Sequence, residues 1–204
     1  YMTIGQAGEM KLAAASIACT DMELRPTRHC GRGGVGAVMG AKGLKAIVLD
    51  DAVCESRKPK NPEAFKAANK LFVQGIQSHS VSGEGLPAYG TNIPANIINE
   101  AGGYPVNNFS TGQFKNTQKV SGETQAELEE KRGGNPTHGC RRGCVIKCSG
   151  IFVYKDGKNV SKQPEYETVW AHGANCGIDD LDTIARLDRM DEVGKGTPLG
   201  RIIG

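Results

Sequence analysis

The chain has 204 residues, enough for one large domain or two small ones. Its 25 basic and 22 acidic residues give a net charge of +3, which is too balanced to indicate a nucleic acid or a membrane surface as partner. No apolar run reaches the length of about 18 residues that a membrane-spanning helix needs, so we expect no membrane span. The 28 glycines are about twice the average share and indicate loops that approach a ligand closely.

The sequence begins in mid-pattern, without an initiator methionine or a targeting signal, so we expect a fragment of a larger protein. Its seven cysteines are an odd number. An odd count without a signal peptide argues against disulfides and for a reducing compartment. We therefore expect a cytoplasmic protein.

Residues 1–4 are typical of a strand end, and residues 10–24 fit a strand or a helix. A glycine-rich turn at residues 31–36 should lead into a short apolar segment, 37–39, and then into a strand at 44–49. Glycines at 31, 33 and 36 satisfy the GxGxxG spacing. We expect neither a strand before this turn nor a long helix after it, so a dinucleotide-binding unit is not indicated.

The same turn can expose several backbone N–H groups, with Arg28 and Arg32 beside it. Backbone amides and arginines suit phosphate or another anion. No Lys-Ser/Thr follows the glycines, so the turn is not a Walker A loop. The spacing alone is equally compatible with ligand binding and with a purely structural turn. The candidate ligand-binding residues are Gly31, Arg32, Gly33 and Gly34.

Residues 51–61 have the composition of a linker, and Asn61 is the expected N-cap of an amphipathic helix over 62–79. Residues 80–122 should form long loops with one short helix at 93–100, and long ordered loops are often functional. A short charged helix is predicted at 123–132.

Beyond the cysteine-rich segment, residues 151–160 predict a hairpin with a two-residue Asp156-Gly157 turn. Residues 164–190 should be mostly helical, with Asp179 or Asp180 capping a helix over 180–190. Glutamates at a helix start usually complement the helix dipole, and His172 is more often a packed or surface residue than a catalyst. No Ser/His/Asp order or HExxH string is present.

The most informative stretch is HGCRRGCVIKCS, residues 138–149, which places Cys140, Cys144 and Cys148 at a strict spacing of four. Iron–sulfur clusters are held mostly by cysteine thiolates. A helix would keep the three thiols near one face, and a loop could also bring them together. Arg141, Arg142 and Lys147 add positive charge that suits an anionic centre.

Other interpretations of these cysteines are free structural thiols, disulfides, a zinc site joined by His138, or an irregular radical-SAM motif. Zinc motifs usually show paired CxxC knuckles or histidines at ligand distance, and radical-SAM enzymes space their cysteines differently. An iron–sulfur cluster is favoured. A four-iron cluster needs a fourth ligand, for which Cys176 is the nearest candidate in sequence unless the ligand lies outside the chain.

Three motifs together resemble one family, the tungsten- or molybdenum-containing aldehyde ferredoxin oxidoreductases. They are IGQAGE with GRGGVGAVMGAKGLKAIVLD, the cysteine segment, and PEYETVWAHGANCGIDDLD, found at residues 4–9 with 31–50, 138–149 and 164–182. Their order and distances agree with the family, and the resemblance covers nearly all of the chain.

The resemblance implies an α+β fold, in which the end of an N-terminal β domain is followed by a mainly helical domain. Residues 1–50 would belong to the pterin-binding β domain, 51–61 to a linker and 62–204 to the cluster-binding domain. The implied cofactors are a [4Fe-4S] cluster and a tungsten or molybdenum bis-pterin bridged by magnesium. The implied activity is oxidation of an aldehyde to a carboxylic acid.

In this reading the three cysteines bind the cluster and the glycine-rich turn contacts the pterin. Glu167 matches the family's glutamate near the metal, with a role in proton transfer. Asp191 matches the start of the DxxGLD pterin-binding motif. The electron acceptor would be ferredoxin or an iron–sulfur subunit, and the enzyme could form a homodimer.

The sequence departs from the family at two points. The first cysteine gap has one extra residue, which indicates a divergent subgroup whose substrate is not carried over. After Met190 the match breaks, and we expect a missing segment there. Two alternatives stay open: an electron-transfer or reductive subunit of the same fold, similar to aryl-CoA reductases, and a zinc-binding structural module.

Overall fold

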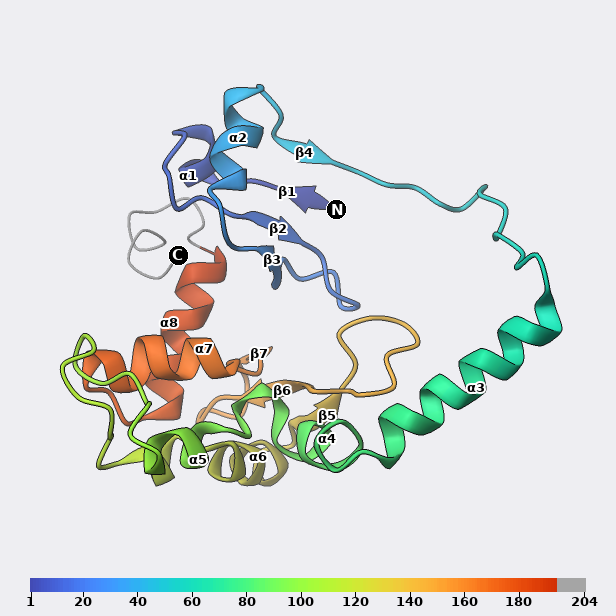
Figure 1. The fold of residues 1–204 in the computed structure, drawn as a ribbon. Helices are drawn as coiled ribbons and strands as arrows, with labels where there is room; N and C mark the ends of the chain where they lie inside the picture. The colour runs from blue at the N-terminus through green and yellow to red at the C-terminus, as the bar shows by residue number, and fades with distance from the viewer. Residues whose placement is uncertain (194–204) are drawn as a thin grey trace.

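The chain has an α+β fold, as the sequence predicts (Figure 1). The structure is a computed structural model that describes residues 1–193 and their side chains as far as Met190. It contains a four-stranded sheet in the first 47 residues and a three-stranded sheet surrounded by helices after residue 80. No helix in this described part combines the length and apolar character needed to cross a membrane.

The first sheet is antiparallel, with the strand order β3-β2-β1-β4. Its elements are β1 (Met2–Thr3), α1 (Gln6–Glu9), β2 (Ile17–Cys19), β3 (Arg28–Cys30), α2 (Val35–Ala41) and β4 (Ala46–Ile47). The strand at the start of the chain is confirmed, and the ambiguous residues 10–24 contribute the strand β2. The strand predicted at 44–49 is only two residues long.

The expectation of no strand before the glycine-rich turn was wrong, whereas the expectation of no long helix after it is confirmed, because α2 has only seven residues. Strand β3 ends just before the turn, and helix α2 begins just after it. This helix can form because glycine lets it pack closely on α1: a Cβ atom at Gly40 would collide with the carbonyl oxygen of Gly8. The sheet is nevertheless antiparallel, so the absence of a dinucleotide-binding βαβ unit holds.

Helix α3 (Pro62–Ser78) follows an exposed segment, residues 48–60, that has no helix or strand. Its predicted cap is confirmed, since Asn61 Oδ1 accepts a hydrogen bond from the backbone N–H of Ala64 at 3.0 Å. The helix projects from the rest of the chain (Figure 1) and buries none of its own residues. Its apolar side chains Phe65 and Phe72 remain 60% and 69% exposed. The amphipathic face is therefore uncovered within the described chain.

Residues 80–100 form consecutive short helices, so the long loop predicted from residue 80 begins only after Glu100. The elements are η1 (Ser80–Gly85), α4 (Leu86–Tyr89), η2 (Gly90–Asn92), α5 (Ala95–Glu100), η3 (Thr117–Lys119) and α6 (Gly122–Lys131). Helices α5 and α6 confirm the predictions at 93–100 and 123–132. Ser121 caps α6 by accepting a hydrogen bond from the N–H of Thr124 at 3.3 Å.

The second sheet has the antiparallel order β5-β6-β7 and precedes the last helices. Its elements and those that follow are β5 (Asn135–His138), β6 (Ser149–Val153), β7 (Val160–Lys162), α7 (Tyr166–Thr168), η4 (Val169–Gly173), η5 (Ala174–Cys176) and α8 (Leu181–Val193). Strand β5 was not predicted. The mostly helical segment after residue 164 is confirmed, and Asp180 Oδ2 accepts from the N–H of Thr183 at 2.9 Å at the start of α8.

The predicted hairpin exists as β6–β7, but its two-residue turn was wrong. The pair Val153 and Val160 closes the ladder, and the N–H of Tyr154 still donates to the carbonyl of Asn159 at 3.1 Å. A two-residue Asp-Gly turn needs positive φ at both positions, whereas here Gly157 has φ +67° and Asp156 does not have a positive φ. Asp156 instead accepts hydrogen bonds from the N–H groups of Lys158 and Asn159, which widens the turn.

The main core lies between the second sheet and α8. It consists of Val120, Phe152, Tyr154, Val169, Leu181, Ile184 and Ala185. A mostly buried ion pair borders it, with Arg132 Nη2 3.0 Å from Asp182 Oδ2. This packing fixes the second sheet, and with it the two strands that flank the loop between β5 and β6.

Candidate metal and cofactor site

The three clustered cysteines lie in the loop that joins β5 to β6, residues 139–148. This loop contains no helix, so the alternative in which a helix aligns the thiols was wrong. Gly143 and Lys147 have φ values of +79° and +56°, which a right-handed helix cannot contain. Cys140, Cys144 and Cys148 all lie in this irregular loop, and each is half-buried.

The three thiols interact with one another. The backbone N–H of Lys147 donates to Cys144 Sγ at 3.4 Å, and this contact is the main cause of the lowered pKa of Cys144; Cys140 lowers it further. Burial raises the pKa of Cys148, and the nearby Glu165, Cys140 and Cys144 raise it further. N–H donation to a thiolate and mutual electrostatic contact are properties of cysteines that share one anionic centre.

The donor set consists of cysteine thiols, the ligand type that holds most iron–sulfur clusters. Among the described residues, no three His, Cys, Asp or Glu side chains are arranged around one point where an ion could bind. Zinc needs such convergence, whereas in a cluster each cysteine binds a different iron atom. His138, the suggested fourth zinc ligand, places its Nε2 2.8 Å from Glu23 Oε1 instead.

Glu165, whose charge acts on Cys148, connects three other elements. Its Oε1 lies 3.1 Å from Lys162 Nζ and 3.4 Å from Arg28 Nη1, and its Oε2 accepts from Thr91 Oγ1 at 2.6 Å. Burial alone would raise the pKa of Glu165, but Lys162, Thr91 and Arg28 outweigh burial and hold it below the usual range. Glu165 is therefore a partly buried anion. Sequence reasoning assigned it only to a helix start, yet it makes no capping bond there.

Glu167, the predicted catalytic residue, has a different environment. It lies in the first turn of α7 with an exposed side chain, and it makes no hydrogen bond or ion pair with another described residue. Burial raises the pKa of the neighbouring Tyr166, and the charge of Glu167 raises it further. The structure thus places one glutamate of the PEYET segment inside an ion-pair network and the other at the surface.

The glycine-rich turn contains glycines of two kinds. Gly34 and Gly36 are required by packing, because a Cβ atom on either would collide with the backbone between Ala13 and Ser16. Added Cβ atoms on Gly31 and Gly33 would meet nothing within 4 Å, and Arg32 between them is exposed. Gly33 needs its φ of +79°, whereas Gly31 has neither a positive φ nor a close neighbour. Gly31 is therefore the glycine that the fold itself does not explain.

Arg28 connects the glycine-rich turn to the cysteine loop. It lies on β3, two residues before the last strand residue, and its Nη2 donates to Ser149 Oγ at 2.6 Å. Ser149 directly follows Cys148. The Nε–H group of Arg28 is buried and has no acceptor among the described residues. The strand before the glycine-rich turn is therefore joined to the residue after the cysteine loop, and the Arg28 Nε–H is a buried donor at this junction.

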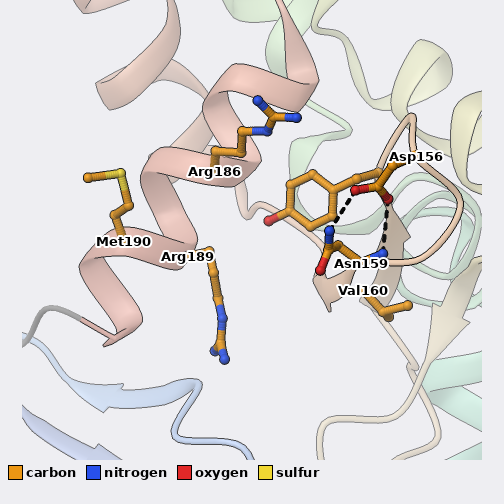
Figure 2. A pocket seen from close by; sticks show the side chains of 7 residues that line it. Asp156, Asn159, Val160, Arg186, Arg189 and Met190 are labelled. Carbon is orange, nitrogen blue, oxygen red and sulfur yellow. Dashed lines mark hydrogen bonds between the residues drawn. The ribbon is translucent and has the colours of Figure 1, made fainter.

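A separate pocket lies between the β6–β7 turn and α8, with a volume of about 510 Å³ (Figure 2). Its lining residues are Tyr154, Asp156, Asn159, Val160, Arg186, Arg189 and Met190. Hydrogen bonds from Asn159 and Lys158 lower the pKa of Asp156 to about 2, so the pocket contains one fixed carboxylate beside two arginines. None of the predicted site residues lines it.

Three further predictions meet the structure only in part. Asp191 lies near the end of α8, but its side chain lies outside the described residues, as does the segment 194–204 where a gap was expected. Cys176 is exposed on η5 and its Sγ lies 3.3 Å from the carbonyl oxygen of Ala171. His172 is 5% exposed and burial lowers its pKa, which confirms a packed residue.

Comparison with known proteins gives family matches over most of the chain. The family described as aldehyde ferredoxin oxidoreductase, domains 2 & 3, matches residues 67–194, and its N-terminal domain matches residues 1–51. Tungsten-containing aldehyde ferredoxin oxidoreductases of Pyrococcus horikoshii and Pyrococcus furiosus are each 40% identical, over 198 and 196 residues. These alignments cover 96% of this chain but 30% of each relative.

A more distant relative in Pyrococcus furiosus is named aliphatic sulfonate oxidoreductase, WOR-like subunit. It is 29% identical over 211 residues, covering 98% of this chain and 31% of the relative. The chain thus spans about a third of the length of the relatives that it matches.

Proposed function

Because this chain belongs to the aldehyde ferredoxin oxidoreductase family, we propose that it forms part of a tungsten- or molybdenum-pterin enzyme that oxidises an aldehyde to a carboxylic acid. Electrons leave through a [4Fe-4S] cluster to ferredoxin. The observation that carries this proposal is the cysteine loop: three interacting thiols, one with a backbone N–H donor, in a loop whose following residue, Ser149, contacts Arg28 on the strand before the glycine-rich turn.

Cys140, Cys144 and Cys148 are the proposed cluster ligands. The exposed Arg141, Arg142 and Lys147 surround them and offset the negative charge of thiolates and cluster. The fourth ligand is Cys176 or a residue outside this chain. In the proposed domain division, residues 1–50 form the C-terminal part of a pterin-binding β domain and 62–204 belong to the cluster-binding domain. Residues 51–61 are the linker between the two.

The residues that would hold the pterin are Gly31, Arg32, Gly33 and Gly34, with Asp191 at the end of α8, and magnesium would be a further cofactor. The exposed backbone at Gly31 lets a bulky anion approach closely, and Arg32 supplies a charged donor. When bound, the pterin-held metal supplies the two-electron redox chemistry of the reaction.

Glu167 is the proposed proton-transfer group. Oxidation of an aldehyde takes an oxygen atom from water and releases two protons and two electrons, so a base must accept a proton. The Glu167 carboxylate makes no competing hydrogen bond within the described chain and lies two residues from the ordered Glu165. A carboxylate in this position can take the proton at either oxygen once substrate excludes water.

A second candidate keeps the fold and changes the reaction. The relative named as an aliphatic sulfonate oxidoreductase shows that the name of the family does not determine the substrate. In this alternative the chain serves an electron-transfer or reductive subunit, similar to aryl-CoA reductases. A homodimer, an iron–sulfur partner subunit and a cytoplasmic location remain further proposals for the complete enzyme.

The test uses the anaerobically purified full-length enzyme. We expect about four iron atoms and about one tungsten or molybdenum per chain. Cys148→Ser should abolish the paramagnetic signal of the reduced cluster, whereas Cys54→Ser, in the exposed segment before α3, should preserve it. Glu167→Gln should keep both metals and lower aldehyde oxidation by about a hundredfold or more. Its matched control is Glu127→Gln, on the exposed face of α6.

Iron without tungsten or molybdenum, or unchanged turnover in Glu167→Gln, would favour the second candidate. Zinc as the sole metal would mean that the cysteine loop is a structural module.

A further inference from the structure

Glu165, at the start of α7, contacts three other segments of the chain, and one of them, β3, belongs to the first sheet. Lys162 belongs to β7, Thr91 to η2 and Arg28 to β3. The backbone N–H of Tyr166 also donates to Thr91 Oγ1 at 3.0 Å, which fixes the start of α7. Arg28 is the one member of this set that precedes residue 50, so it joins the set to the first sheet; His138 on β5 and Glu23 make a second contact between the two parts.

The same arginine also contacts Ser149, the first residue of β6, which directly follows the cysteine loop. Its Nη2 donates to Ser149 Oγ at 2.6 Å while its Nη1 lies 3.4 Å from Glu165 Oε1. A planar guanidinium can serve both acceptors at once, which a lysine ammonium does less well. The Arg28 side chain is 26% exposed, and its Nε–H is buried without an acceptor among the described residues. Arg28 therefore has one donor free to face a group bound between the sheets.

The three charged side chains of this network sum to a net positive charge, and the network reaches the last cysteine through Glu165 and through Ser149. Glu165 is one anion between two cations, Arg28 and Lys162, and the side chain of Lys162 is 9% exposed. Charges that are partly removed from water act over several ångströms with little screening. Reduction adds an electron to a cluster, so a nearby positive charge favours the reduced form and raises the reduction potential.

We propose that Arg28 is a positioning residue that holds β3 against the cysteine loop and raises the reduction potential of the cluster bound by Cys140, Cys144 and Cys148. The inference rests on the proposed function for the presence of that cluster. The negative charge of Glu165 lowers the reduction potential, so the Arg28–Glu165 ion pair sets two opposite effects against each other.

The test is a redox titration of the full-length enzyme followed by electron paramagnetic resonance. Arg28→Met removes the charge and the hydrogen bonds, so the midpoint potential should shift to more negative values. Arg28→Lys keeps the charge and should restore most of the wild-type potential. Glu165→Gln should shift the potential in the positive direction. The control Lys45→Met removes a charge from an exposed pair with Glu9 and should leave the potential unchanged.

A second measurement needs no cluster. In metal-free full-length protein, hydrogen–deuterium exchange of residues 139–149 should be faster in Arg28→Met than in wild type and Lys45→Met, because the contact with Ser149 is lost. Unchanged exchange would overturn the positioning role, and an unchanged midpoint potential in Arg28→Met would overturn the electrostatic role. A wild-type enzyme without an iron–sulfur signal would instead refute the proposed function, and the exchange data would still decide the role of Arg28.

Discussion

Glu129 offers the sharpest test of the packing around the cysteine-bearing sheet. It lies on α6 and is fully buried, and neither carboxyl oxygen has a hydrogen-bond partner in the described chain. Burial raises its pKa from the ordinary value of 4.5 to about 8. Gln125 opposes this shift only in part, because its amide is already bonded to the Pro164 carbonyl and to Asn92. Glu129 is therefore protonated in the folded protein at neutral pH.

The sign of the pH dependence follows from proton binding. Between pH 4.5 and pH 8 the folded state keeps the Glu129 proton, whereas the unfolded state has released it. The folded state then binds more protons, so the free energy of unfolding falls as the pH rises. Each pH unit is worth about 1.4 kcal/mol, and this one group should lower the opening free energy by about 3 to 4 kcal/mol between pH 5 and pH 8.

The assay compares Glu129→Gln with wild type by hydrogen–deuterium exchange of the α6 amides in the full-length protein. Glutamine has nearly the shape of the neutral acid but cannot ionise. The two proteins should have similar opening free energies at pH 5, and Glu129→Gln should be more stable by about 3 kcal/mol at pH 8. Glu127→Gln, on the exposed face of the same helix, is the control and should behave like wild type. Equal pH profiles for Glu129→Gln and wild type would refute the buried, neutral carboxyl.

Four further predictions concern other parts of the fold. Asp182→Ala removes the carboxylate partner of Arg132, whose side chain is only 16% exposed. In denaturant titration this change should lower the unfolding free energy by about 3 kcal/mol. The control Lys119→Ala, in an exposed ion pair, should lower it by less than about 1 kcal/mol. Asn61→Ala removes the cap of α3 and should lower the opening free energy of its first turn by about 1 kcal/mol in hydrogen exchange; an unchanged rate would contradict the cap. Gly40→Ala should destabilise the first sheet, because its Cβ meets the Gly8 carbonyl, and thermal unfolding would show this. Gly31→Ala should leave the unfolding temperature unchanged and lower pterin content, and retention of full pterin content would exclude Gly31 from the cofactor site.

Local patterns decided several elements before any tertiary contact was considered. The Asn61 cap and the amphipathic period defined α3, and Asp180 defined the start of α8, because caps and helical periods act over a few neighbouring residues. The three cysteines were identified for the same reason, since a spacing of four within nine residues is visible in the chain itself. The family matches extend this agreement to the fold class.

Other features depended on contacts between distant segments. The glycine-rich turn was compatible with a structural and a ligand-binding role until packing separated Gly36, which the backbone near Ala15 requires, from Gly31, which has open space around it. Strand β5 has little strand propensity in Asn135–His138 and forms because β6 pairs with it. The cysteine loop is irregular because Lys147 adopts a left-handed conformation that no local pattern predicts.

The sequence by itself determined the chemistry that this chain can offer: three thiols in one segment, a flexible glycine turn with arginines, and two glutamates at the start of a helix. Only the tertiary structure decided which of these groups are ion-paired and partly buried and which are exposed. It partly buried Glu165 among Arg28, Lys162 and Thr91, and it left Glu167 exposed two residues later. The physical reason is that Arg28 and Thr91 lie 137 and 74 residues from Glu165 in the chain, and spacing within one segment carries no information about such contacts.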